Sequence, residues 1–428
     1  VKWKPHAFAV YHVIGRGVLI DLAKMNPARL TWAEPAVVRA PVKTHECGIT
    51  ARGWALHPSG LPEQRHDLWR GGRVRALKAK WTGAQTVRFG KEGAASEPEA
   101  AAVMGWNALL AGEAPLTLEA GAQVTMLVDT EDYLCGFPRV ETEGGSGAVV
   151  RWEWAESLFD TMEGFIPPKG NRGAIARKIF NGFGDRWTLA GGRRWASTPW
   201  WRAGRYWLLS VKVGAEPLTL HTVAVERTGF PLQRTMRVAT SDETLEPVVE
   251  LSERGLRACM HDVFVDCPYY EQMMYVADTR VQMLLSYVMG GEERLPRRGM
   301  ELFDLSRGRS GYPAMRTPSN ERQESATFAM IWPWMLHDFA LWRDDAAWLR
   351  GRMVGLRALI EGLVAEADGE GLLRRPPGWL FVDCVPEWFA GWAPGTFERP
   401  GKRSAIVNLQ YLLALQRAAD LEEWVGEL

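Results

Sequence analysis

Three carboxylates lie close together in the sequence DCPYYEQMMYVADTR, residues 266–280. They are Asp266, Glu271 and Asp278, and tyrosine and methionine residues surround them. Apolar surroundings raise the pKa of a carboxyl group because burial disfavours its charged form. Glycoside hydrolysis needs such a group, a carboxylic acid that stays protonated near neutral pH and donates to the glycosidic oxygen. Glu271 could be that acid, with Asp266 and Asp278 binding sugar hydroxyls.

The same carboxylates also fit an ordinary structural interpretation. Because Pro268 disfavours a helical conformation for the residue before it, DCPYYEQ is predicted to be a loop that follows a helix. Asp278 could then cap the next helix, Asp266 could accept hydrogen bonds from loop amides, and Glu271 could be solvated. Spacing alone favours this interpretation, since acidic residues are common near helix starts.

Composition narrows the class of partner. The chain has 428 residues with 51 basic and 51 acidic side chains, so charge gives no reason to expect nucleic acid or an anionic membrane. No apolar run approaches the roughly 18 residues that span a membrane. Its 21 tryptophans suit the apolar faces of sugar rings as well as a protein core. The five cysteines form no CxxC pair, so we expect neither a zinc ribbon nor a redox pair.

The periodicity of apolar residues divides the chain in two. Residues 1–235 contain short apolar runs separated by turn residues, which predicts antiparallel β-sandwich structure in one domain, or in two with a boundary near 100–140. Residues 236–428 contain at least five amphipathic segments at helical spacing, the first capped by Ser241 or Asp242. A second helix is predicted to stop at Gly290-Gly291. The long loops expected at 292–323 and 368–403 are candidates for function.

The opening motif resembles the signature of the α-L-rhamnosidase family of glycoside hydrolases. That family shows Asp-Cys-Pro, a Glu shortly after, an aromatic residue four positions beyond the Glu and an Asp three further on, here Asp266, Glu271, Tyr275 and Asp278. Two departures are Tyr275, where family members often carry Trp, and one residue fewer between the Pro and the Glu. FAMIWPWMLHDFALWRDDAAWL, GLLRRPPGWLFVDC and GNRGAIARKIFNGFGDRW also resemble family segments, so the resemblance covers about residues 140–428.

The resemblance implies a β-sandwich followed by an (α/α)6 barrel, and removal of terminal L-rhamnose from glycosides or polysaccharides with inversion. Glu271 would be the general acid, and Tyr275 would stack near a sugar held by Asp266 and Asp278. Four further candidates for substrate binding are Arg280, Trp332, Trp379 and Asp383. Arg280 could equally form a surface ion pair, and the two tryptophans could equally belong to the core.

The general base is the missing part of this assignment. Inversion needs a second carboxylate about 6.5–9.5 Å from the acid, and the resemblance puts it in a late helix of the barrel. The segments after residue 236 are too few for six helical hairpins, so we expect the barrel to be incomplete. Glu387, in DCVPEWFAGW, is the candidate base within the chain. The alternatives are an (α/α)6 glycosidase for another sugar and a non-catalytic carbohydrate-binding relative.

We expect no cofactor and no metal, because no cluster of His with Cys or Asp has ligand spacing. The expected partner is a carbohydrate, a rhamnoside, rather than nucleic acid or membrane. Oligomeric state does not follow from the sequence. The compartment would be extracellular or periplasmic if a signal peptide had been removed, and otherwise cytoplasmic.

Overall fold

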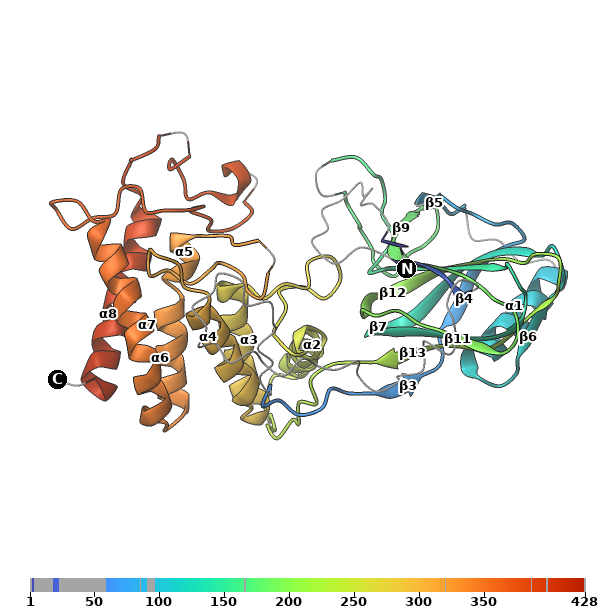
Figure 1. Cartoon of the computed structure of the whole chain (residues 1–428), viewed down its shortest axis with the longest axis horizontal. Coiled ribbons are helices and arrows are strands. Elements are labelled where there is room, and N and C mark those ends of the chain that lie inside the picture. The colour runs from blue at the N-terminus through green and yellow to red at the C-terminus, as the bar shows by residue number, and fades with distance from the viewer. Residues whose placement is uncertain are drawn as a thin grey trace, which may run out of the picture. The chain divides into compact units, whose positions relative to one another are not determined.

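The computed structural model describes residues 2–3, 18–22, 59–84, 86–90, 97–164, 167–319, 321–385, 387–397 and 399–426. The chain is mixed α and β, with two compact units, Val1–Gly229 and Phe230–Leu428 (Figure 1). The division falls a few residues before position 235, where the sequence predicts it. One of the apolar runs from which strands are predicted, AVYHVIGRGVLIDL at residues 9–22, lies mostly outside the described residues.

The first unit is built on an 11-stranded sheet with the order β1-β2-β10-β8-β12-β7-β13-β3, in which β4 and β11 also pair with β7, and β6 with β13. A separate two-stranded sheet joins β5 and β9. Among the described strands every pairing is antiparallel except that of β2 with β10. The strands are β1 (Lys2–Trp3), β2 (Val18–Asp21), β3 (Asp67–Trp69), β4 (Arg73–Lys78), β5 (Thr86–Arg88), β6 (Leu116–Leu118), β7 (Gln123–Gly144), β8 (Val149–Ala155), β9 (Ile179–Asn181), β10 (Phe183–Thr188), β11 (Arg194–Ala196), β12 (Arg202–Lys212) and β13 (Leu218–Arg227).

The centre of this sheet is buried on both faces, which explains its near-continuous apolar strand sequences. Trp207 of β12 pairs with Trp154 of β8, and both indoles are buried on one face. Leu208, the next residue along β12, points to the opposite face, because successive side chains of a strand alternate between faces. There it belongs to a buried cluster that also contains Leu127 of β7. The 22-residue β7 pairs with different strands along its length, so the hydrogen bonds run through one continuous sheet. The division into two sheets of a sandwich stays a prediction.

One helix in the first unit contradicts the sequence analysis, which assigns residues 1–235 to β structure. Helix α1 (Glu97–Ala111) packs against β4, β6 and β13. Its sequence, EPEAAAVMGWNALLA, is rich in alanine and leucine, the residues with high helix propensity. This helix propensity can be read from the sequence, but the strand-like apolar runs on both sides led the whole region to be assigned to β structure.

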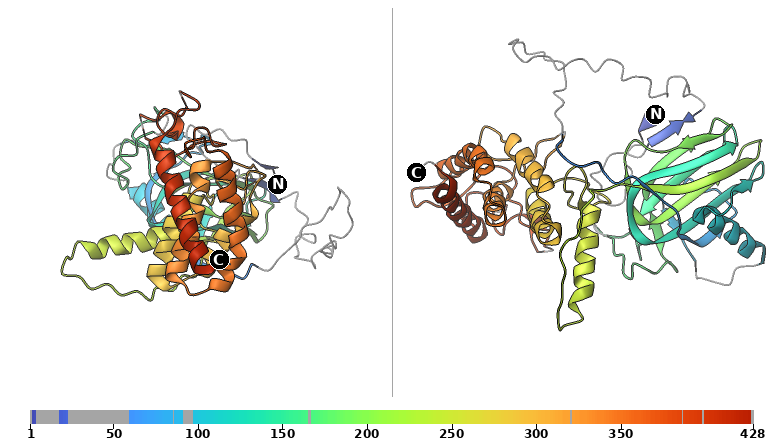
Figure 2. Two further views of the ribbon diagram at one scale, coloured as in Figure 1. Left: turned by 90° about the vertical axis from the view of Figure 1, so that its left-hand side faces the viewer. Right: turned by 90° about the horizontal axis from the view of Figure 1, so that it is seen from below.

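The second unit is helical (Figures 1 and 2). Helices α3 and α4 form one helical hairpin, and α6 and α7 form another. Gly291 ends α3 in the left-handed conformation, with φ 64°, and its N–H donates to the Tyr287 carbonyl, as the sequence predicts. The helices are α2 (Leu245–Cys259), α3 (Val276–Gly290), α4 (Arg294–Leu305), α5 (Ala326–Ala329), α6 (Trp332–Trp342), α7 (Ala346–Ala365) and α8 (Ala405–Val425), with a 3-10 turn at Phe389–Gly391.

Two details of the helical prediction were wrong. Helix α4 lies inside the segment 292–323 that the sequence analysis treats as loop, and Pro296 in its first turn obscures the helical pattern. Helix α2 begins after Thr244, whereas Asp242 accepts hydrogen bonds from the Thr244 amide and hydroxyl just before the helix. None of the helices among the described residues is long and apolar enough to cross a membrane.

The helical hairpins determine where the long loops gather. Helix α6 contacts α3 on one side and α8 on the other, while α4 contacts α7. Short connections link α3 to α4 and α6 to α7, so the long loops before α3, α5 and α8 lie at the opposite ends of these helices (Figure 1). Residues 260–275, 306–325 and 366–404 therefore meet at one end of the unit.

A buried ion pair in the first unit gives a test of its packing. Arg202 contacts Asp185 through Nε to Oδ2 at 2.9 Å and Nη2 to Oδ1 at 2.8 Å, and both side chains are almost fully buried. Arg202→Ala would remove the guanidinium that neutralises a buried carboxylate, so we expect urea unfolding of this unit to show a loss of about 3–5 kcal/mol. Arg73→Ala, which breaks the exposed pair with Glu131, should cost less than about 1 kcal/mol. Equal losses in the two variants would contradict this account.

Candidate active site

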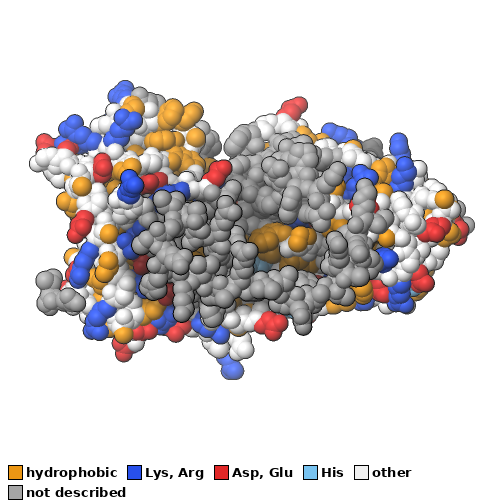
Figure 3. Space-filling model, viewed as in Figure 1, with side chains coloured by type: hydrophobic (Ala, Val, Ile, Leu, Met, Phe, Trp, Pro, Cys, Tyr) orange, Lys and Arg blue, Asp and Glu red, His pale blue; other side chains and the backbone are white. Residues whose placement is uncertain are grey.

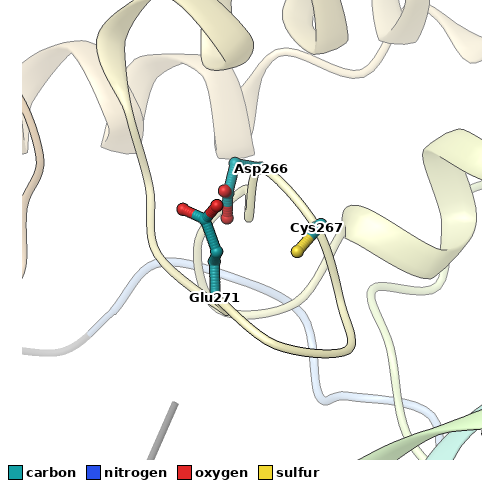
Figure 4. A group of neighbouring side chains, drawn as sticks. All are labelled: Asp266, Cys267 and Glu271. Atoms are coloured by element: carbon teal, nitrogen blue, oxygen red, sulfur yellow. The ribbon is translucent and has the colours of Figure 1, made fainter. Parts of the chain in front are cut away.

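The loop between α2 and α3 folds back on itself and carries the first two carboxylates. The Asp266 N–H donates to the Met273 carbonyl at 2.9 Å, and the Met273 N–H donates to Asp266 Oδ1 at 3.3 Å. Gln272 turns the chain with a left-handed φ of 53°, and its N–H donates to the Cys267 carbonyl. A residue other than glycine adopts this conformation at some cost. The turn directs Glu271 back toward Asp266 (Figure 4).

The Asp266 and Glu271 carboxyl groups lie next to each other (Figure 4), and a hydrogen bond between them requires a proton on one of the two. Ligand atoms of Asp266, Cys267 and Glu271 all lie within 4.8 Å of one another. Burial, followed by the hydrogen bond and the charge of Glu271, raises the pKa of Asp266 to about 9. The pair therefore holds a proton at neutral pH, whereas the sequence analysis assigns that proton to Glu271 alone.

Asp278 joins this group from the first turn of α3. Tyr275, rather than Asp278, is the residue at the N-cap of that helix. Burial raises the pKa of Asp278 to about 6, and the charges of Glu271 and Asp383 contribute in the same direction. Asp278 thus lies within electrostatic reach of both acids.

Asp383 comes from the long loop before α8, more than a hundred residues further along the chain. Its side chain is exposed, and its Oδ1 accepts the Cys384 N–H at 2.7 Å. The structure brings Asp266, Glu271, Asp278 and Asp383 together at the end of the helical unit where the long loops meet. Glu387, four residues beyond Asp383, is exposed.

Two thiols beside the carboxylates are held in the protonated form. Burial raises the pKa of Cys259 to about 12, and it raises that of Cys267 as well. A thiolate is the form that attacks or binds metal. By position, Asp266, Cys267 and Glu271 could hold a metal ion, but the protonated thiol and the carboxyl pair that shares a proton are poor ligands.

Tyr275 is held in place by an arginine that the sequence analysis missed. Its side chain is buried, and its hydroxyl accepts a hydrogen bond from Arg316 Nη1 at 3.1 Å. The Arg316 guanidinium lies 5.9 Å from the centre of the tyrosine ring. Backbone hydrogen bonds from Val276 to Met315 and from Thr317 to Met274 join the two segments. No local pattern around Arg316 could have revealed this contact.

Two of the residues predicted to bind substrate have structural partners. Arg280 Nε lies 2.7 Å from Asp338 Oδ2, which joins α3 to α6, and its guanidinium lies over the Trp334 ring. Trp332 is fully buried and donates its indole N–H to the Met300 carbonyl at 3.1 Å. Both residues therefore support the packing of the helices.

Trp379 belongs to an aromatic group at the start of the Asp383 loop. Its ring lies 4.5 Å from that of Phe381, which in turn lies 5.5 Å from Phe328. Its amide N–H donates to the Glu324 carbonyl at 2.9 Å. The sequence analysis singled out only Trp379, because nothing in the spacing indicates that Phe328 and Phe381 would meet.

Comparison with known proteins relates the helical unit to a family. Residues 233–428 match the family model described as the bacterial alpha-L-rhamnosidase 6 hairpin glycosidase domain. No curated protein matches the chain. Solved structures with a similar fold include a GH78 family rhamnosidase of Bacillus sp. GL1, with TM-score 0.61 and 23% identity over 74% of this chain. A rhamnosidase from Klebsiella oxytoca with rhamnose bound has TM-score 0.60 and 18% identity over 85% of this chain.

Because these structures are less than 25% identical to this chain, the similarity shows that the fold is shared and no more. The chain covers 32% of the Bacillus enzyme and 67% of the Klebsiella enzyme. An α-L-rhamnosidase from Dictyoglomus thermophilum, with TM-score 0.53 and 14% identity, is covered to 34% by 73% of this chain. Residues 233–428 are therefore similar to the bacterial alpha-L-rhamnosidase 6 hairpin glycosidase domain.

Proposed function

We propose that this protein is an inverting α-L-rhamnosidase, in which Glu271 donates a proton to the glycosidic oxygen of a terminal L-rhamnose. The observation that carries the proposal is the hydrogen-bonded pair of Asp266 and Glu271, with Asp278 and Asp383 in reach. The family match of residues 233–428 and the rhamnose bound in the Klebsiella structure support the choice of sugar.

The shared proton gives each carboxyl group a task. As the bond to the leaving group breaks, Glu271 passes a proton to the departing oxygen and becomes a carboxylate. That proton is the one the pair shares, so both Asp266 and Glu271 are carboxylates once it has left. Asp266 and Asp278 also face the place where a sugar would sit, and carboxyl groups accept hydrogen bonds from hydroxyls. Asp383 would bind the sugar from the opposite loop, beside Trp379.

The second half of the reaction needs a base to activate water. Within the chain we assign that role to Glu387, which is exposed on the same loop as Asp383. A base outside these residues would fit a barrel of which this chain forms only part. The two helical hairpins and α8 would then be a fraction of the six hairpins that the family model names.

A glycosidase acting on another sugar is the main alternative. It is favoured by Tyr275, which stands where the rhamnosidase signature often has Trp and is fixed by Arg316. A non-catalytic carbohydrate-binding protein would need only the carboxylates and no base. Hydrolysis of a panel of aryl glycosides by the protein separates these possibilities, because only the main proposal requires release from the α-L-rhamnoside.

The role of Glu271 can be tested with leaving groups of different basicity. A poor leaving group such as phenol needs protonation, whereas dinitrophenol departs readily as an anion. Glu271→Gln should lower kcat for phenyl α-L-rhamnoside by about 10²–10⁴-fold and should affect the dinitrophenyl substrate much less.

The control for this experiment is Glu361→Gln, at an exposed position on α7. It should leave both rates unchanged. A loss in Glu271→Gln that is equal for the two leaving groups would rule out the acid role, since a purely structural defect does not depend on the leaving group.

The buried carboxylates also predict how stability depends on pH. The folded-state pKa of Asp278 is raised from 3.8 to about 6, so its stabilising contribution is present below pH 4 and is lost as the pH rises through 6. Between pH 4 and pH 7, the Asp278→Asn variant should lose about 2 kcal/mol less unfolding free energy than the unmodified protein. Urea unfolding of the helical unit measures this difference. The exposed Asp344→Asn should keep the original pH dependence, and an unchanged slope in Asp278→Asn would contradict the assignment.

A further inference from the structure

A cavity lies in the loop that carries Asp383. Its volume is about 420 Å³, within the roughly 300–1,000 Å³ of small-molecule pockets. In the space-filling view, hydrophobic side chains gather in the upper left, and Lys and Arg side chains lie close by (Figure 3). The cavity is lined by Arg374, Arg375, Pro376, Pro377, Gly378, Leu380, Trp392, Thr396, Phe397, Pro400 and Gly401.

One wall of this cavity is aromatic and partly exposed. Phe397 lies 4.0 Å from Phe389 with nearly parallel rings, and the Trp392 ring lies 5.5 Å from Phe397. Phe397 remains 44% exposed and Phe389 55% exposed, although large apolar side chains gain by burial. A flat apolar wall of this kind can stack against the apolar face of a sugar ring, which presents C–H groups.

The charge of the lining is positive. Arg374 is engaged by Asp368, with Nε to Oδ2 at 2.7 Å, and Asp368 also pairs with Arg403. Arg375 is exposed and has no ion-pair partner among the described residues. The described lining contains no Asp or Glu. A guanidinium in this position can bind a carboxylate through two parallel hydrogen bonds.

The cavity and the carboxylate site share one loop. Gly378 and Leu380 line the cavity, and the chain then continues through Phe381 to Asp383. The Ala393 N–H donates to the Leu380 carbonyl at 2.8 Å, and the Val382 N–H donates to the Gly391 carbonyl at 2.8 Å. These hydrogen bonds fix the cavity wall to the segment that presents Asp383.

We propose that this cavity is a second sugar subsite, which binds a carboxylate-bearing sugar residue of the same saccharide whose terminal sugar meets Glu271. Arg375 binds the carboxylate, and Phe397 supports the ring. The inference rests on the proposed function for the nature of the substrate. It narrows that substrate to an acidic saccharide, such as one with a uronic acid beyond the terminal rhamnose.

Direct binding tests the subsite without depending on hydrolysis. Methyl glucuronide and methyl glucoside are titrated into the protein at low salt, and the Kd of each is measured by NMR. The two probes differ at the carboxylate, so we expect glucuronide to bind about tenfold more tightly. Arg375→Ala should abolish this preference, and Phe397→Ala should weaken the binding of both probes.

The matched control is Arg350→Ala on α7, because Arg350 is also exposed and has no ion-pair partner among the described residues. It should retain the preference. Equal affinity for glucuronide and glucoside, or an equal loss in Arg350→Ala and Arg375→Ala, would overturn the inference.

A parallel titration with L-rhamnose separates this inference from the proposed function. L-Rhamnose should bind the unmodified protein and the Arg375→Ala variant alike, and should bind Asp278→Asn more weakly. Glucuronide preference without rhamnose binding would contradict the proposed function and keep the subsite. Rhamnose binding without a preference for glucuronide would contradict the subsite and keep the proposed function.

Discussion

The hydrogen bond between the Asp266 and Glu271 carboxyl groups is the interaction on which the candidate site depends. Two carboxylates this close cannot both be ionised without strong repulsion, and their partial burial adds a cost for either charge. A shared proton removes that repulsion. A carboxyl group that keeps its proton at neutral pH is what the proposed glycosidic cleavage requires.

The loops, more than the helices, position the carboxyl groups that hold this proton. The helical hairpins keep their connections short at one end, so the long loops are left together at the other. The loop before α3 brings Asp266 and Glu271 together by a turn at Gln272 with unfavourable backbone geometry. The loop before α8 contributes Asp383, and α3 adds Asp278 from its first turn. The contact of Arg280 with Asp338 joins α3 to α6.

Local sequence patterns predicted the elements with strong periodicity. The central strands β7, β8, β12 and β13 and the end of α3 at Gly291 follow from apolar runs and glycine chemistry. Helices α1 and α4 were missed because a short Ala-rich segment between strands and a proline near a helix start weaken the same patterns.

The motif also predicted that Asp266, Glu271 and Asp278 would form one group, since all three lie within a few turns of chain. It could not predict which residues from distant loops would join them. The contact of Arg316 with Tyr275, the burial of Trp332 and the cavity beside Asp383 depend on how loops far apart in sequence meet. Those contacts are set by tertiary packing, which a single sequence does not display.

The shared proton can be observed directly by infrared spectroscopy. A protonated carboxyl group absorbs separately from a carboxylate, so the unmodified protein at pH 7 should show a protonated carboxyl band that is lost as the pH rises through about 9. The band should disappear in Asp266→Asn at pH 7. A spectrum in which every carboxyl group of the protein is already ionised at pH 7 would contradict the account.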